Sequence, residues 1–163
     1  MSYMTPLSKK RWSSGSGLLY SFEEVSNIVF SHSQSNKIFI GSDSFLSKRN
    51  TCFATAVCLL TENHGGKYFL YKERIKTNQY NILSTRITEE VRRSIELAEH
   101  FMNTYNILPN NIELHLDVSP FAAKNGTSKF SEMLRGYVQG YGFECKLKPD
   151  AWASQTVADK HSK

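Results

Sequence analysis

The nine residues KIFIGSDSF, residues 37–45, decide the fold of this chain. Ile38, Phe39 and Ile40 are apolar on both alternating faces, which is the pattern of a strand covered on both sides. Asp43 comes at the carboxyl end of that run, where an unpaired carboxylate is costly to bury and needs a partner charge or a metal ion. We therefore expect a central strand that ends in a functional acidic residue.

Two further strands follow this stretch, at residues 51–60 and 67–75. Their connections, residues 47–50 and 62–66, are short and polar, which favours antiparallel neighbours. The second strand is also apolar on both faces over residues 53–57, so these strands should lie in the centre of the molecule.

Helices are predicted before, between and after the strands. Ser21 and Glu24 form a capping box, which begins a short helix that ends near His32. Apolar residues recur with helical period from about residue 84 to 105 and predict one long amphipathic helix. A second stripe indicates another helix, and a final helix is expected over residues 152–160. The stripes are Ile87, Val91, Ile95, Ala98 and Met102 in the long helix, and Phe130, Met133, Leu134, Tyr137 and Val138 in the next one.

Two more strands, at residues 112–118 and 143–148, complete the order βββαβαβα after the first helix. The long helix crosses over between the third and fourth strands, and such a connection should be right-handed. It can place the strand at 112–118 parallel to and beside the strand at 37–45. We therefore predict an α/β fold with a mixed five-stranded sheet, three antiparallel strands followed by two parallel ones, and helices on both faces.

Length and composition favour one domain. A chain of 163 residues with 40% hydrophobic residues can bury one core and is too short for two ordinary domains. We expect a single domain over residues 18–163, preceded by a flexible basic arm at residues 1–17, which are rich in Ser, Lys and Gly. The net charge of +5 and the pI near 9.1 favour a polyanionic partner such as nucleic acid. The oligomeric state stays open.

The cysteines and the lack of long apolar segments argue against several protein classes. Cys52, Cys58 and Cys145 form no CxxC motif and no set with His at metal-ligand spacing, so we expect neither a disulfide framework nor a zinc site. No stretch is long enough to span a membrane, and the N-terminal residues lack the apolar segment of a signal peptide. We therefore expect a cytoplasmic protein with no membrane partner.

Several acidic residues fall where the predicted fold would bring them together. Asp117 occupies the carboxyl end of the fourth strand, so its carboxylate should converge with that of Asp43 if the two strands are neighbours. On the long helix, Glu89 projects away from the apolar stripe, whereas Glu90 lies at the edge of the stripe and can face the sheet. Glu90 is thus the stronger candidate, although Glu89 adjoins it.

A fourth carboxylate can come from the last part of the chain. Either Asp150, just after the fifth strand, or Asp159, about two turns into the last helix, could complete the cluster. Geometry favours Asp159, because a helix that folds back across the sheet carries it about 13 Å along the helix axis toward the other acids. Asp150 is better placed to cap that helix.

The candidate ligands are all hard oxygen donors. Carboxylates without Cys or His pairs suit Mg²⁺ or Mn²⁺ rather than zinc. Two such ions about 4 Å apart can activate a water and stabilise the leaving oxygen of a phosphodiester, which is nuclease chemistry. His115 and His161 could assist proton transfer, but a single His more often has a structural role, so we leave both outside the catalytic set.

Several segments resemble the YkuK-like family of predicted RNase H-like nucleases, over roughly residues 18–161. The resemblance implies an RNase H-like fold and metal-dependent nuclease activity. It matches Asp43 to the first-strand aspartate, Glu90 to the helix glutamate, Asp117 to the fourth-strand aspartate and Asp159 to the acid of the last helix. The segments are Ile40-Gly41-Ser42-Asp43-Ser44, His115-Leu116-Asp117-Val118, residues 136–143 (GYVQGYGF), residues 148–154 (KPDAWAS) and Val157-Ala158-Asp159.

Three functions compete at this point. The leading hypothesis is a two-metal nuclease that cuts RNA, an RNA–DNA hybrid or structured DNA, with two Mg²⁺ or Mn²⁺ ions as cofactors. The alternative is a non-catalytic RNase H-like module that binds nucleic acid or a protein and keeps the acids for structure. A phosphate-transfer enzyme acting on a small nucleotide ranks last, because the chain has no glycine-rich phosphate loop.

Overall fold

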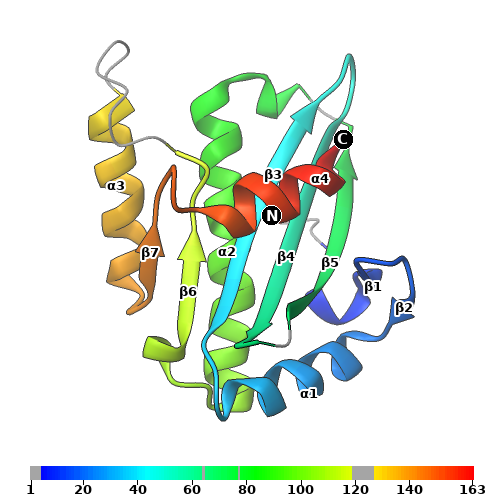
Figure 1. The fold of residues 1–163 in the computed structure, drawn as a ribbon. Coiled ribbons are helices and arrows are strands. Elements are labelled where there is room, and N and C mark those ends of the chain that lie inside the picture. Colours follow the sequence, from blue (N-terminus) through cyan, green and yellow to red (C-terminus); the bar gives the residue numbers. More distant parts are fainter. Residues whose placement is uncertain (1–4, 64, 77, 119–126) are drawn as a thin grey trace.

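The fold is a seven-stranded mixed sheet covered by helices on both faces (Figure 1). The computed structural model describes residues 5–63, 65–76, 78–118 and 127–163. The strands lie in the order β2-β1-β5-β4-β3-β6-β7. Their bounds are β1 (Trp12–Ser14), β2 (Leu19–Tyr20), β3 (Ile38–Leu46), β4 (Thr51–Thr61), β5 (Gly65–Ile75), β6 (Ile112–His115) and β7 (Glu144–Lys146).

The described helices agree closely with the predicted positions. The capping box at Ser21 and Glu24 begins the first helix, with both reciprocal hydrogen bonds present. In the described residues the helices are α1 (Phe22–Ser33), α2 (Leu83–Tyr105), α3 (Thr127–Gly140) and α4 (Asp159–Ser162), with the π-helical segment η5 (Ala153–Ala158) leading into α4. Three short 3-10 turns are η1 (Leu7–Lys9), η2 (Gln79–Asn81) and η3 (Pro109–Asn111). In this described part, no helix is long and apolar enough to cross a membrane.

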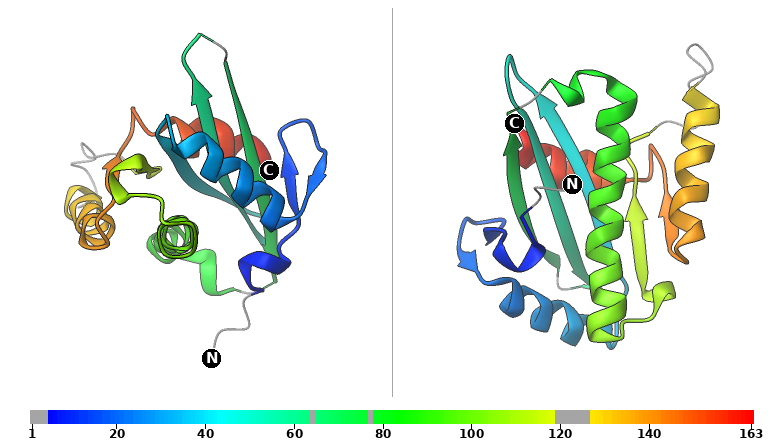
Figure 2. Two further views of the ribbon diagram at one scale, coloured as in Figure 1. Left: turned by 90° about the horizontal axis from the view of Figure 1, so that it is seen from below. Right: turned by 180° about the vertical axis from the view of Figure 1, so that it is seen from behind.

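The strand pairing follows the predicted topology. Strands β3, β4 and β5 form an antiparallel meander, and β6 lies parallel to β3 with the register Ile38↔Ile112 to Gly41↔His115. Strand β7 continues the sheet in parallel to β6. Helix α2 is the crossover that returns the chain from β5 to β6, and it lies across one face of the sheet (Figure 2).

The prediction of five strands was wrong because two short strands precede α1: β1 lies within the expected arm of residues 1–17, and β2 lies just after it. Strand β1 pairs with the outer edge of β5, and β2 pairs with β1. Trp12 anchors the pair: it is fully buried, stacked on Phe22 with 5.0 Å between ring centroids and edge-on to Tyr71 at 4.8 Å. Strands of two or three residues carry no detectable alternation. Residues 1–4 of the expected arm lie outside the described residues.

Each face of the sheet has its own apolar layer. On one face, Ile38 and Ile40 of β3 belong to the main core together with residues of α1, α2 and α3. On the other face, Phe39 packs in a smaller cluster with Ala153 and Val157 of the C-terminal helical segment, residues 152–162. Figure 1 shows this segment crossing in front of β3 and β4, with α2 behind them. The predicted cover on both faces is therefore confirmed.

His115 fastens the C-terminal helical segment to the sheet. Its Nδ1 accepts a hydrogen bond from the Ala153 amide at 3.0 Å, so the proton of the neutral ring sits on Nε2, which lies 2.8 Å from Glu113 Oε2. The ring also packs against Phe39 and Trp152. Burial lowers the pKa of His115, which favours this neutral, structural form.

Gly41 allows the same segment to approach β3 closely. A Cβ atom at this position would lie 2.5 Å from the backbone of Ala153 and Ser154, and backbone cannot move aside as a flexible side chain can. The glycine at the centre of β3 thus sets how near the C-terminal helical segment comes to the carboxyl end of that strand.

We predict that Gly41→Ala lowers the free energy of unfolding by about 1–3 kcal/mol, the usual cost of overpacking a close contact. Gly136→Ala is the matched control, because a Cβ there meets nothing within 4 Å on helix α3. Alanine favours helix over glycine by about 0.5–1 kcal/mol, so the control should be neutral or more stable. Urea unfolding followed by circular dichroism measures both. Equal stability of Gly41→Ala and the parent chain would contradict the close approach.

Candidate metal centre

Three carboxylates meet at one edge of β3. Asp43 of β3, Glu90 of α2 and Asp117 after β6 each offer an oxygen within 4.8 Å of the others. Asp43 and Glu90 are each only 6% exposed, whereas Asp117 keeps more contact with solvent. These three residues are called the acidic triad below.

The parallel ladder explains why two of the triad residues meet. Asp43 lies two residues beyond Gly41, and Asp117 lies two residues beyond His115, its partner in the register. The ladder between β3 and β6 ends at that pair. The chain after β6 then stays beside β7, since the amide of Leu116 donates to the carbonyl of Lys146 at 2.9 Å. The two aspartates therefore sit at equivalent positions where the edge of β3 is open.

Glu90 joins the aspartates from the helix that covers the opposite face of β3. Alternate residues of a strand point to opposite faces. Ser42 bonds to Ser94 of α2, and Ser44 Oγ donates to Glu90 Oε2 at 2.5 Å. Asp43 instead accepts a hydrogen bond from Ser162 Oγ of α4 at 3.2 Å. The carboxyl group of Glu90 approaches that of Asp43 beyond the end of the β3–β6 ladder, where this edge of β3 is unpaired.

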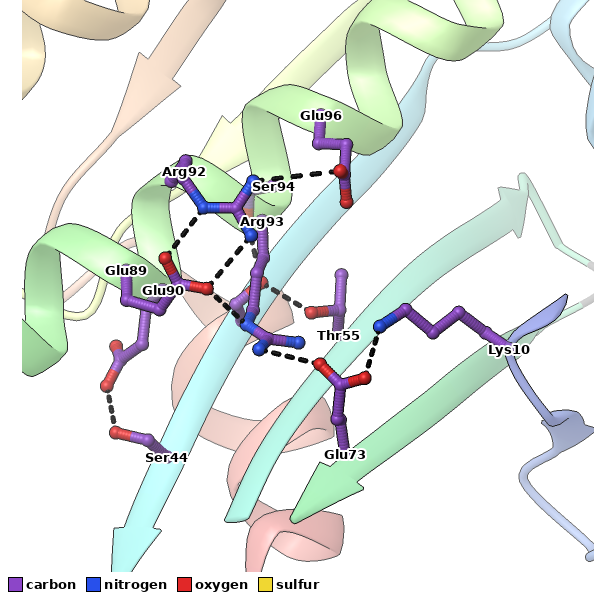
Figure 3. Close-up of polar contacts among 11 residues, drawn as sticks. Lys10, Ser44, Thr55, Glu73, Glu89, Glu90, Arg92, Arg93, Ser94 and Glu96 are labelled. Carbon is purple, nitrogen blue, oxygen red and sulfur yellow. Dashed lines mark hydrogen bonds and ion pairs between the residues drawn. The ribbon is translucent and has the colours of Figure 1, made fainter. Parts of the chain in front are cut away.

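The structure separates Glu90 from Glu89 through a buried charge network (Figure 3). Glu89 binds Arg92 at 2.6 and 2.9 Å and Arg93 at 2.8 Å. Arg93, which is 1% exposed, also forms an ion pair with Glu73 at 2.8 Å, although without hydrogen-bond geometry. The charge of Glu89 is thus compensated away from the triad, while Glu90 points toward Ser44.

Asp159 and Asp150 also differ in position. Asp159 lies at the start of α4, and its carboxyl group contacts that of Asp43, although it is not within the tight group of three. Asp150 is exposed and lies apart from the triad. The expected cap at Asp150 was wrong: no side chain caps η5, and the Ala151 amide is bound by Gln155 Oε1 at 3.2 Å.

The electrostatics of the site show a concentration of uncompensated negative charge. Burial, together with the nearby carboxyl groups of Asp159 and Asp117, raises the pKa of Asp43 to about 7. Burial also raises the pKa of Glu90 well above its usual value, and Ser44 offsets this only in part. Arg86 lowers the pKa of Glu90 from a distance, but among the described residues no cation forms an ion pair with either of the two innermost carboxylates.

Sequence reasoning missed four residues at this site. Ser44 binds Glu90, and Ser162 binds Asp43. Lys148 forms an ion pair with Asp117 at 2.8 Å, and Lys163 lies 3.3 Å from Asp159. The two serines could have been found from the sequence, because a polar residue within a buried strand or at the end of a helix needs a hydrogen-bond partner. The lysines had none, because ordinary exposed lysines look the same in sequence.

The donor set fits a hard divalent cation. Mg²⁺ and Mn²⁺ prefer carboxylate oxygens, and the triad supplies three of them without a Cys or His ligand. A bound cation would stabilise the ionised forms of Asp43 and Glu90, whose pKa values burial raises. Asp159 lies beside Asp43 but outside this group of three.

The raised pKa of Asp43 predicts how stability without metal depends on pH. Between pH 3.8 and about 7 the folded chain retains a proton that the unfolded chain has lost, so this residue's contribution to the free energy of unfolding falls as pH rises. Asp43→Asn removes that loss. In EDTA at pH 8 we expect the variant to be about 1–3 kcal/mol more stable than the parent, since one pKa unit is worth about 1.4 kcal/mol.

The quantity to compare is the difference in the free energy of unfolding between variant and parent at each pH. Buried histidines such as His115, whose pKa is lowered, make the free energy of unfolding rise with pH in both proteins, and this contribution cancels in the difference. Chemical unfolding at pH 8 and near pH 4 measures it, and the advantage of Asp43→Asn should shrink at the lower pH. Asp150→Asn, an exposed site, is the control and should show no pH-dependent gain. A constant difference at both pH values would contradict the raised pKa.

Comparison with known proteins agrees with the fold. A family model described as Ribonuclease H-like matches residues 21–163. No curated protein matches the sequence. The match covers nearly all of the chain, from the start of α1 to the end of α4. Because the match extends over far more than half of the sequence, the chain belongs to the Ribonuclease H-like family.

Proposed function

We propose that this chain is a divalent-metal-dependent nuclease that hydrolyses phosphodiester bonds in RNA, an RNA–DNA hybrid or structured DNA. The observation that carries the proposal is the meeting of Asp43, Glu90 and Asp117, from three separate elements, at a site with too little positive charge. Buried carboxylates that repel one another cost stability, and such groups gather where a function requires them.

In this proposal, Asp43, Glu90, Asp117 and Asp159 hold two Mg²⁺ or Mn²⁺ ions. Bound ions would supply Lewis acidity toward a phosphodiester and a lower pKa for bound water. Asp43 is the central ligand, because both Asp117 and Asp159 contact its carboxyl group. Ser44 and Ser162 orient Glu90 and Asp43 through hydrogen bonds.

Asp159 and Asp117, the two more exposed acids, would face the substrate. The side chain of Asp159 is 40% exposed and that of Asp117 is 22% exposed, so both are open to a strand arriving from solvent. A carboxylate in that position can bind a water molecule and accept its proton. The net charge of +5 supports a polyanionic substrate, because basic side chains elsewhere on the chain can neutralise phosphates.

The test is cleavage of end-labelled single-stranded RNA, RNA–DNA hybrid and branched DNA in Mg²⁺, Mn²⁺ or EDTA. We expect metal-dependent cleavage of at least one substrate. Asp43→Asn, Glu90→Gln, Asp117→Asn and Asp159→Asn should each lower the rate on the order of 100-fold or more, since even residues behind metal ligands contribute about 10- to 100-fold.

Asp150→Asn and Glu89→Gln serve as controls for the two neighbouring acids. Asp150→Asn should cleave at the parent rate. Glu89→Gln should lose stability through Arg93 but keep metal-dependent cleavage at a temperature where it remains folded. Loss of activity at Asp150 with retention at Asp159 would reverse their assignment. Tight Mn²⁺ binding without cleavage of any substrate would favour the non-catalytic binding module.

A further inference from the structure

Lys148 is the cation in direct contact with the acidic triad. Its Nζ lies 2.8 Å from Asp117 Oδ1, and its side chain is 42% exposed. No other ion pair within the described residues includes a member of the triad. Lys163 pairs with Asp159 instead, at 3.3 Å on the exposed last turn.

The backbone fixes Lys148 beside Asp117. Leu116 donates its amide to the carbonyl of Lys146 at 2.9 Å, and the amide of Lys148 donates to the carbonyl of Val118 at 3.0 Å. These two bonds keep the segments that follow β6 and β7 side by side past the ends of both strands. They hold the backbone of Lys148 near that of Asp117, and from there the lysine side chain reaches the carboxylate.

A divalent cation and the Lys148 ammonium would compete for Asp117. Each neutralises the same carboxylate, and like charges a few ångströms apart repel. The lysine side chain is long and flexible, so it can swing away while its backbone stays in place. The released ammonium would remain at the mouth of the site, where a phosphate of a bound strand must lie if the strand is to reach the carboxylates.

We propose that Lys148 is the internal counter-ion of Asp117 in the metal-free protein and becomes a phosphate-binding residue for the nucleic acid strand once a divalent cation has replaced it. The inference rests on the proposed function. Under this proposal, bound metal raises the affinity for nucleic acid, because the cation that displaces Lys148 from Asp117 frees the lysine to bind a phosphate. By linkage, nucleic acid must raise the affinity for metal by the same factor.

The test compares Lys148→Gln with Lys146→Gln, a matched loss of charge at an exposed position of the adjoining strand β7. The first measurement is Mn²⁺ affinity, by titration calorimetry without nucleic acid. Lys148→Gln should bind Mn²⁺ roughly fivefold to tenfold more tightly than the parent, because a competing cation is gone. Lys146→Gln should stay within about twofold of the parent.

The second measurement is the affinity for a short fluorescein-labelled RNA and for the matching RNA–DNA hybrid, by fluorescence anisotropy in Ca²⁺ or EDTA. Ca²⁺ shares the preference for oxygen ligands, and gels confirm that the strands stay intact. The parent should bind more tightly in Ca²⁺ than in EDTA. Lys148→Gln should lose most of that gain, and the slope of log affinity against log salt in Ca²⁺ should fall by about one.

Lys148→Arg keeps the charge and should retain both the competition with metal and the gain in Ca²⁺. Equal Mn²⁺ affinity in Lys148→Gln and Lys146→Gln would overturn the counter-ion role. An unchanged gain in Ca²⁺ for Lys148→Gln would overturn the phosphate role. A parent chain that binds no Mn²⁺ would instead defeat the proposed function itself, so the two failures are distinguishable.

Discussion

The parallel ladder between β3 and β6 is the contact on which the rest of this structure depends. It runs from Ile38↔Ile112 to Gly41↔His115 and then stops. Because it stops there, the next two residues of each strand carry Asp43 and Asp117 to an edge that no backbone pairing occupies.

The C-terminal helical segment depends on the same two residues that end the ladder. Gly41 leaves room for the backbone of Ala153 and Ser154, and His115 accepts the amide of Ala153. The segment therefore packs on β3 at a fixed position along the strand. As a result, α4 begins beside Asp43. The π-helical turns of η5 precede Asp159, and such turns occur often near functional sites.

Charge is distributed unequally around the site. On the far side of Glu90, the network of Glu89, Arg92, Arg93 and Glu73 pairs acid with base and joins α2 to β5 (Figure 3). Lys10 extends it to the segment before β1 by binding Glu73. At the triad the acids are in excess, which costs stability. A fold that is stable elsewhere can carry a destabilised site of this kind.

The sequence by itself determined the order of the long elements, the capping box of α1, the parallel placement of β6 beside β3, and the presence of Asp43 and Asp117 at the same end of the sheet. These follow from local periodicity and from the handedness of crossover connections. Only the tertiary structure decided the small strands β1 and β2, because one buried Trp12 holds them rather than a repeating pattern.

Only the tertiary structure gives the neighbouring acids different surroundings. Glu89 and Glu90 adjoin on one helix, and what separates them is Arg93, which bridges Glu89 to Glu73 on a strand distant in sequence. The packing of the C-terminal helical segment on Gly41 places Asp159 near Asp43 and leaves Asp150 apart from the triad. Lys148 contacts Asp117 because hydrogen bonds hold the segments after β6 and β7 side by side. Each of these outcomes depends on contacts between residues far apart in the chain, and local patterns in a sequence carry no record of such contacts.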